Sequence, residues 1–104
     1  MSDSPLGQVA ISKAGRDQGR AFLIVGVADE AHVLLCDGVL RKLDRPKKKK
    51  RKHLRIEPVC AEVIREKLNE GSRIFDAEIR KQLITLGYNL DRQEVGGIDC
   101  QSKT

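Results

Sequence analysis

The first 57 residues carry short apolar stretches separated by polar turns, a pattern typical of β-strands. Gly7 to Ser12 alternates, with Val9 and Ile11 on one side, whereas Ala21 to Val27 is a continuous apolar run too short for a helix. Asp37-Gly38 is a strong tight-turn signal. We expect strands at residues 7–12, 21–27, 32–36, 39–43 and 54–57. Short strands at this spacing predict a small barrel.

After Pro58 the apolar period becomes that of a helix, and proline is well tolerated in a first helical turn. Two short helices are predicted. Cys60, Ile64 and Leu68 share one face of the first, which ends at Gly71. The second begins with Asp76 as its N-cap, buries Ile79, Leu83 and Leu86, and ends at Gly87.

The predicted fold is therefore mainly β, a barrel of about five strands followed by two short C-terminal α-helices. Residues 1–5 are expected to be a disordered start and residues 6–57 the barrel, with a basic loop at 45–53. Residues 58–87 form the two-helix extension, and residues 88–104 a flexible tail. A chain of 104 residues suits one small domain with a modest core.

Charge is unevenly divided along the chain. Residues 1–56 carry 13 Lys and Arg against 6 Asp and Glu, a net +7, whereas residues 57–104 carry 7 against 9, a net −2. Half of the basic residues fall within 41–55, where Asp44 is the single acid. This segregation indicates a polyanionic partner for the first half.

The basic run is the first candidate site, and we expect it to form a loop tethered between two strands. Its members are Arg41, Lys42, Arg45, Lys47, Lys48, Lys49, Lys50, Arg51, Lys52, His53 and Arg55. Mutual repulsion among these charges makes the run a good site for phosphates. Two other interpretations are a merely solvated charge run and a nuclear import signal.

The second candidate is a glycine loop between the first two predicted strands. Gly15 and Gly19 permit backbone angles that would bring amides close to a phosphate, while Lys13, Arg16 and Arg20 add charge. An ordinary β-turn, with Asp17 bracing its own backbone, is the alternative. The loop lacks the spacing of a P-loop.

A strand, a basic glycine loop and a second strand, as in residues 7–25, resemble a KOW motif. The later stretches Asp37-Gly38-x-Leu40-Arg41-Lys42-Leu43, Pro46-Lys47-Lys48-Lys49 and His53-Leu54 sharpen the likeness, as do the paired helices. Over residues 6–87 the chain resembles the bacterial KOW-domain RNA-binding proteins that are similar to large-subunit ribosomal protein 14e of archaea and eukaryotes.

This resemblance implies an SH3-like barrel and structured RNA as partner, in particular large-subunit ribosomal RNA on the ribosome or during its assembly. The three widely spaced cysteines disfavour disulfides, so we separately expect a cytoplasmic location. We expect the free protein to be a monomer. The phosphate-binding side chains would come from the glycine loop and the basic run. Gln18 stands where such loops commonly carry Lys or Arg.

Aromatic side chains are scarce, which narrows the kind of RNA expected. Phe22, Phe75 and Tyr88 are the only aromatic residues, and both phenylalanines are expected in the core. Proteins that bind single strands usually stack bases on aromatic side chains. The sequence therefore favours backbone contacts to folded RNA.

Other classes of site have little support in the sequence. Cys36, Cys60 and Cys100 are odd in number and widely spaced, which disfavours a disulfide framework. His32 and Cys36 would lie about 13 Å apart along a strand, so no metal site is expected. No catalytic constellation, cofactor motif, signal peptide or membrane span is apparent. The alternatives to RNA binding are a protein-interaction module and a transcription-associated KOW protein that binds DNA.

Overall fold

The computed structural model describes residues 5–89. Five strands form one antiparallel sheet in the order β4-β3-β2-β1-β5. Their bounds are β1 Gln8–Ser12, β2 Ala21–Val27, β3 His32–Cys36, β4 Lys47–Lys50 and β5 Leu54–Cys60. Two helices follow, α1 Glu62–Glu70 and α2 Asp76–Thr85. The prediction of a mainly β fold with two C-terminal helices is confirmed.

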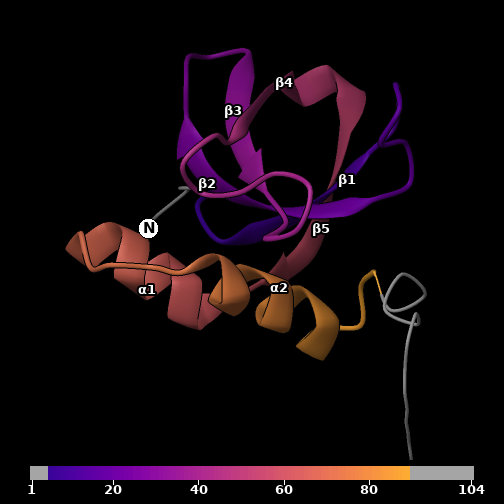
Figure 1. Ribbon diagram of the computed structural model, residues 1–104. Coiled ribbons are helices and arrows are strands. Elements are labelled where there is room, and N and C mark those ends of the chain that lie inside the picture. The colour runs from indigo at the N-terminus through magenta and orange to yellow at the C-terminus, as the bar shows by residue number, and fades with distance from the viewer. Residues whose placement is uncertain (1–4, 90–104) are drawn as a thin grey trace, which may run out of the picture.

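The sheet is strongly curved. β4 and β5 lie at opposite edges of the sheet, yet only the short 3₁₀ turn η1 (Arg51–His53) joins them. The two edges must therefore approach each other, as Figure 1 shows. Bulges, which increase bending, lie in β5 opposite Gln8 and Ala10 of β1, and in β2 between Ile24 and Gly26. β4 and β5 do not pair, so the sheet is barrel-like but open.

β2 is buried on both faces, which explains why its sequence is apolar throughout. Phe22 and Ile24 face the interior of the curved sheet, and Ala21 and Leu23 face the helices. The interior cluster also contains Ala10, Val33, Leu35 and Leu54. The cluster under the helices also contains Val9, Cys36, Ala61, Ile64, Ile79 and Leu83.

Both helices lie against the outer face of the sheet, away from the η1 end (Figure 1). The predicted stop of α1 at Gly71 is confirmed, because Gly71 has the left-handed conformation (φ 78°) that glycine adopts without strain. Ile64 of α1 and Ile79 and Leu83 of α2 are buried, as predicted from the helical period.

The strand predicted at residues 39–43 is wrong. The segment is an irregular loop, because the Asp37 carboxylate accepts the backbone N–H groups of Val39, Leu40 and Arg41 at 2.8–2.9 Å. Those amides are consequently bonded locally instead of to a neighbouring strand. The fourth strand is formed instead by Lys47–Lys50. The run expected to be a basic loop at 45–53 is therefore mostly a strand followed by η1.

The boundary between sheet and helices also differs from the prediction. β5 continues through Pro58 to Cys60, and α1 begins only at Glu62. Pro58 is tolerated because β5 is an edge strand, where a missing N–H need not interrupt pairing. Cys60 pairs with Gln8 of β1 and is not on a helix face.

Asp76 is the first residue of α2 and makes no capping bond, since Phe75 holds the N-cap position. Its carboxylate instead accepts the backbone N–H of Leu43 at 2.7 Å, which ties the 37–46 loop to α2. Phe75 was expected in the core but is 54% exposed, and Arg73 lies over its ring.

Two residues assigned by sequence to the flexible tail are bonded to the sheet. The side chain of Asn89 donates to Ala21 O and accepts from Ala21 N, and the Tyr88 hydroxyl donates to Glu57 Oε1 at 3.1 Å. Both contacts fix the end of α2 beside β2 and β5. The rest of the predicted tail, Cys100 included, and residues 1–4 of the predicted start lie outside the described residues.

Candidate nucleic-acid interface

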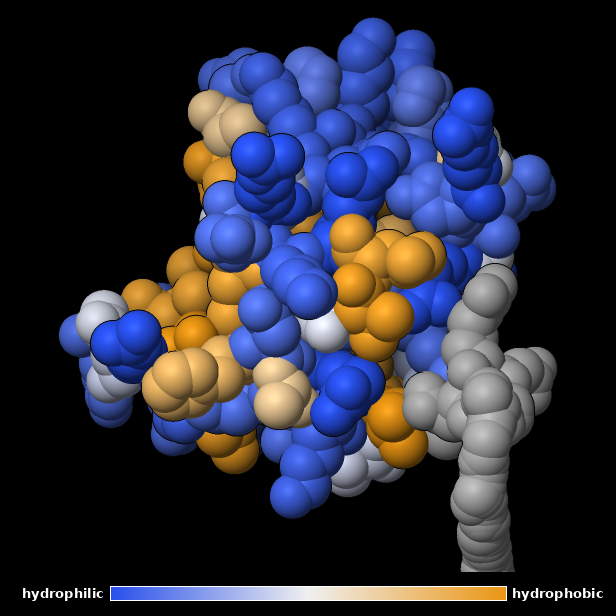
Figure 2. Space-filling view, viewed as in Figure 1, coloured by the Kyte–Doolittle hydropathy of each residue, from blue (hydrophilic) through white to orange (hydrophobic). Residues whose placement is uncertain are grey.

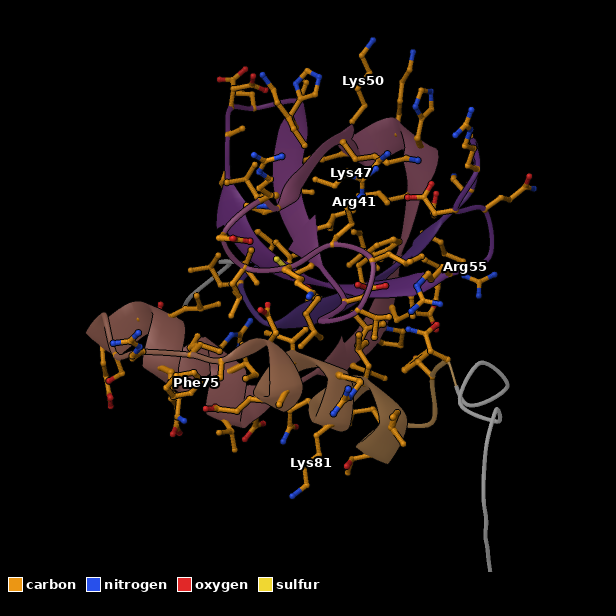
Figure 3. All side chains as sticks on the ribbon, in the orientation of Figure 1. Arg41, Lys47, Lys50, Arg55, Phe75 and Lys81 are labelled. Atoms are coloured by element: carbon orange, nitrogen blue, oxygen red, sulfur yellow. The ribbon has the colours of Figure 1, made fainter. Side chains whose placement is uncertain are left out.

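The four consecutive lysines of β4 point to opposite faces of the sheet. Because side chains alternate along a strand, Lys47 and Lys49 are half-buried and Lys48 and Lys50 are exposed. In Figure 3, Lys47 lies within the curve of the sheet and Lys50 extends from its far end. The run thus contains two lysines directed at the protein itself and two directed at solvent.

Lys49 anchors β4 to the glycine loop. Its side chain is only 9% exposed, and its ammonium donates to Ser12 Oγ at 2.9 Å and to Ala14 O at 2.8 Å. The Asp17 carboxylate lies 3.7 Å from Lys47 Nζ and 3.9 Å from Lys49 Nζ. Asp17 therefore faces two ammonium groups across the curved sheet and does not brace its own turn.

The glycine loop is a closed turn. Gly15 and Gly19 both have φ near +87°, where an L side chain would be strained. The amides of Gln18, Gly19 and Arg20 donate to carbonyls of Gly15, Ser12 and Asp17. These three amides are consequently not open to a phosphate, contrary to the predicted use of the loop. Its exposed cations, Lys13 and Arg16, remain available at the surface.

Arg20 was predicted to contact RNA, but it lies in the interior. Its guanidinium donates to the Asp37 carboxylate, and the two side chains are 6% and 0% exposed. The Asp37-Gly38 pair indicates only a turn, and nothing in it signals a buried ion pair. Arg20 is a structural residue in this fold.

η1 brings further basic side chains to the same end of the sheet. Its backbone is fixed at both sides, because Arg51 N donates to Ala31 O and Lys13 N donates to His53 O, each at 2.8 Å. Arg51, Lys52 and His53 are exposed. Hydrogen bonds to the residues next to β1 and β3 therefore hold η1, and the three side chains that it carries, in place.

The exposed basic side chains come from the glycine loop, the 37–46 loop, β4, η1 and the start of β5, and together we call them the basic face. Its members are Lys13, Arg16, Arg41, Lys42, Arg45, Lys48, Lys50, Arg51, Lys52, His53 and Arg55. In Figure 3, Lys50 extends from the η1 end of the sheet, Arg41 and Arg55 lie between that end and the helices, and Lys81 extends from α2 in the opposite direction to Lys50. Figure 2 shows mainly hydrophilic side chains over the η1 end.

Few acidic side chains neutralise the positive charge of the basic face. Arg55 pairs with Glu57 at 2.8 Å, and among residues 5–89 no ion pair within 4 Å joins an acid to any other member. Asp17 and Asp37 are already engaged by Lys47, Lys49 and Arg20. Asp29 bonds His32, a contact that lowers the pKa of the Asp29 carboxyl. The basic face thus retains most of its positive charge.

A groove of about 510 Å³ opens where the glycine loop faces β4 and the 37–46 loop. Ten residues line it: Gly15, Arg16, Asp17, Gln18, Arg20, Phe22, Leu40, Arg41, Lys47 and Lys49. Five of the ten are basic and one is acidic. This groove has no signal in the sequence, because the fold of the 37–46 loop depends on the Asp37 carboxylate.

The cysteines within the described part of the chain are unsuited to nucleophilic chemistry. Burial, followed by nearby carboxylates, raises the pKa of Cys36 to about 12. Burial also raises the pKa of Cys60. Thiolates are the reactive form, so the raised pKa of each thiol disfavours nucleophilic chemistry at neutral pH.

Two further findings concern residues 5–89 alone. They contain no group of three or more His, Cys, Asp or Glu side chains placed to hold a metal ion. Neither helix has the length and apolarity needed to span a bilayer. In comparisons with known proteins, no family model matches the chain and no curated protein is detectably similar to it.

Proposed function

We propose that this protein binds structured RNA, gripping the phosphate backbone through the basic face, as a ribosomal protein of the large subunit or a factor in its assembly would. The observation that carries the proposal is the basic face, whose ten Lys and Arg side chains are exposed and of which only Arg55 forms an ion pair within the described residues. Phosphate contacts of this kind supply most of the affinity in nucleic-acid binding.

The scarcity of exposed aromatic side chains supports folded RNA over a single strand. Phe22 is fully buried, and Phe75 lies on the helical layer, away from the basic face (Figure 3). No aromatic platform for successive bases exists within the described residues of the basic face. Backbone and shape are the remaining means of recognition, and both suit a helical RNA.

The resemblance to KOW proteins adds to this proposal. The open, curved five-stranded sheet is compatible with an SH3-like barrel, and the cations on its rim include residues of the KOW-like segment, among them Lys13 and Arg16. Arg20 is buried and makes no contribution to the basic face.

The proposal is tested by charge reversal at Lys48 and Lys50. Both side chains are exposed, whereas Lys49 is bonded to Ser12 and must be left intact. The double variant Lys48→Glu, Lys50→Glu should fold normally and lose at least tenfold in affinity for a folded ribosomal RNA fragment, because four units of charge are removed from the binding surface.

A matched control removes the same charge elsewhere. Arg73→Glu with Lys81→Glu changes two exposed cations on the helical side and should leave RNA affinity within about twofold. Equal losses in both variants would show that net charge alone drives binding. Tighter binding of wild-type protein to duplex DNA than to folded RNA at matched salt would favour the transcription-associated alternative.

A further inference from the structure

We propose that the groove beside the glycine loop holds a single unpaired nucleotide of the bound RNA, with its phosphate on the lysine side and its base against Leu40 and Arg41. This inference rests on the proposed RNA binding and adds a site of recognition to it. Contacts to the phosphates of a regular helix need no concavity, whereas a cavity of about 510 Å³ is within the usual range for small-ligand sites.

The lysine side of the groove carries more positive than negative charge. Lys47 and Lys49 share one carboxylate, that of Asp17, at 3.7 and 3.9 Å, distances too long for hydrogen bonds. Two of the three ammonium N–H groups of Lys49 donate to Ser12 Oγ and Ala14 O, whereas the ammonium N–H groups of Lys47 can donate to another acceptor. These ammonium groups therefore suit a phosphate entering the groove.

The 37–46 loop contributes a wall of the groove that consists of Leu40 and Arg41. Leu40 is 64% exposed, and Arg41 beside it is also exposed. Arginine planes stack on bases in the same way as aromatic rings, so the wall can hold a base without an aromatic residue. In a paired helix the bases are stacked inside the duplex, so only an unpaired nucleotide can reach this wall.

The wall is held in place before any ligand arrives. The Asp37 carboxylate accepts the amides of Leu40 and Arg41, and Arg20 fixes Asp37 from inside the sheet. Asp76 accepts the amide of Leu43 and ties the same loop to α2. A preorganised wall of this kind reduces the entropy lost on binding.

The test compares two RNA hairpins of equal length, one fully paired and one with a single bulged adenosine. Wild-type protein should bind the bulged hairpin about tenfold more tightly, as expected for one stacked base. Leu40→Ser leaves every cation of the basic face in place, so it should lose most of this preference while retaining its affinity for the paired hairpin. Lys81→Ala, on the far side of the molecule, is the control and should keep the preference.

Equal wild-type affinity for the two hairpins would overturn the nucleotide site while leaving the proposed RNA binding in place. Failure to bind either hairpin would overturn both. A third arm distinguishes the source of the nucleotide. If adenosine monophosphate shifts the Leu40 methyl resonances and the bulge gives no preference, the groove takes a free nucleotide, and its assignment to RNA is wrong.

Discussion

Arg20 at the end of the glycine loop forms a buried ion pair with Asp37 at the end of β3, joining the two loops that border the groove. Asp37 also accepts three backbone amides of the 37–46 loop. Removal of one partner leaves a charge buried without compensation, which typically costs about 3–5 kcal/mol.

Asp37→Ala should therefore destabilise the protein by about 3–5 kcal/mol, measured as the free energy of unfolding in urea. The exposed Asp44 of the same loop provides the control, and Asp44→Ala should change stability by less than about 0.5 kcal/mol. A loss below about 1 kcal/mol for Asp37→Ala would show that the pair does not organise the loop.

Gly38 should tolerate alanine far less well than Gly19, although both have positive φ. A Cβ on Gly38 would lie 2.3 Å from the backbone oxygen of Asp76, whereas a Cβ on Gly19 meets nothing within 4 Å. Gly19→Ala should cost about 1–2 kcal/mol from strain alone. Gly38→Ala adds a backbone clash and should cost about 2–5 kcal/mol. Equal losses in urea denaturation would contradict the close approach of this loop to α2.

Neighbouring lysines of β4 should affect different properties of the protein when replaced by glutamine. Lys49→Gln removes charged bonds to Ser12 and Ala14 and should cost about 1.5–3 kcal/mol of stability. Lys48→Gln should change stability by less than about 0.5 kcal/mol but weaken RNA binding. Thermal unfolding and RNA titration of the two variants separate these roles. Loss of stability in Lys48→Gln instead would contradict the orientation of β4.

The absorbance of Tyr88 tests whether the segment after α2 packs against β5 of the sheet. Burial first, and then its bond to Glu57, raises the pKa of Tyr88 above its ordinary value of 10.0. It is the only tyrosine and the chain has no tryptophan, so phenolate absorbance reports this residue alone. Glu57→Gln should lower the pKa of Tyr88 but leave it above 10.0, because burial remains.

The sign of the accompanying stability change follows from linkage. The folded state holds the phenolic proton more tightly than the unfolded state, so the contribution is present below pH 10.0 and is lost as pH rises through the raised pKa. Tyr88→Phe should remove that part of the alkaline loss of stability. An ordinary pKa for Tyr88 would show that the residue is not packed beside Glu57.

The elements predicted best from the sequence are those whose pattern depends on local burial. The strands β1, β2 and β3 and the helical positions of Ile64, Ile79 and Leu83 follow from apolar spacing. The fourth strand could not be found in this way, because four lysines lack any apolar signal. They form a strand since β3 offers an edge for pairing and Lys49 has partners in β1 and the loop after it.

The candidate site was predicted by composition but not by geometry. The sum of charges singled out the basic run, most of whose side chains are exposed, but it could not distinguish Lys48, which is exposed, from Lys49, which is bonded to Ser12. Arg20 was misassigned for a similar reason, since its partner Asp37 is 17 residues away in sequence. Polar contacts between residues far apart in sequence produce no regular residue spacing from which they could be predicted.

The central claim is tested most directly by the salt dependence of binding to a folded RNA. If about six cations of the basic face neutralise phosphates, the logarithm of the affinity should fall with the logarithm of salt concentration at a slope of about −4 to −5. The Lys48→Glu, Lys50→Glu variant should show a shallower slope, and the Arg73→Glu, Lys81→Glu control an unchanged one. A wild-type slope near zero on every folded RNA tested would contradict phosphate binding by the basic face.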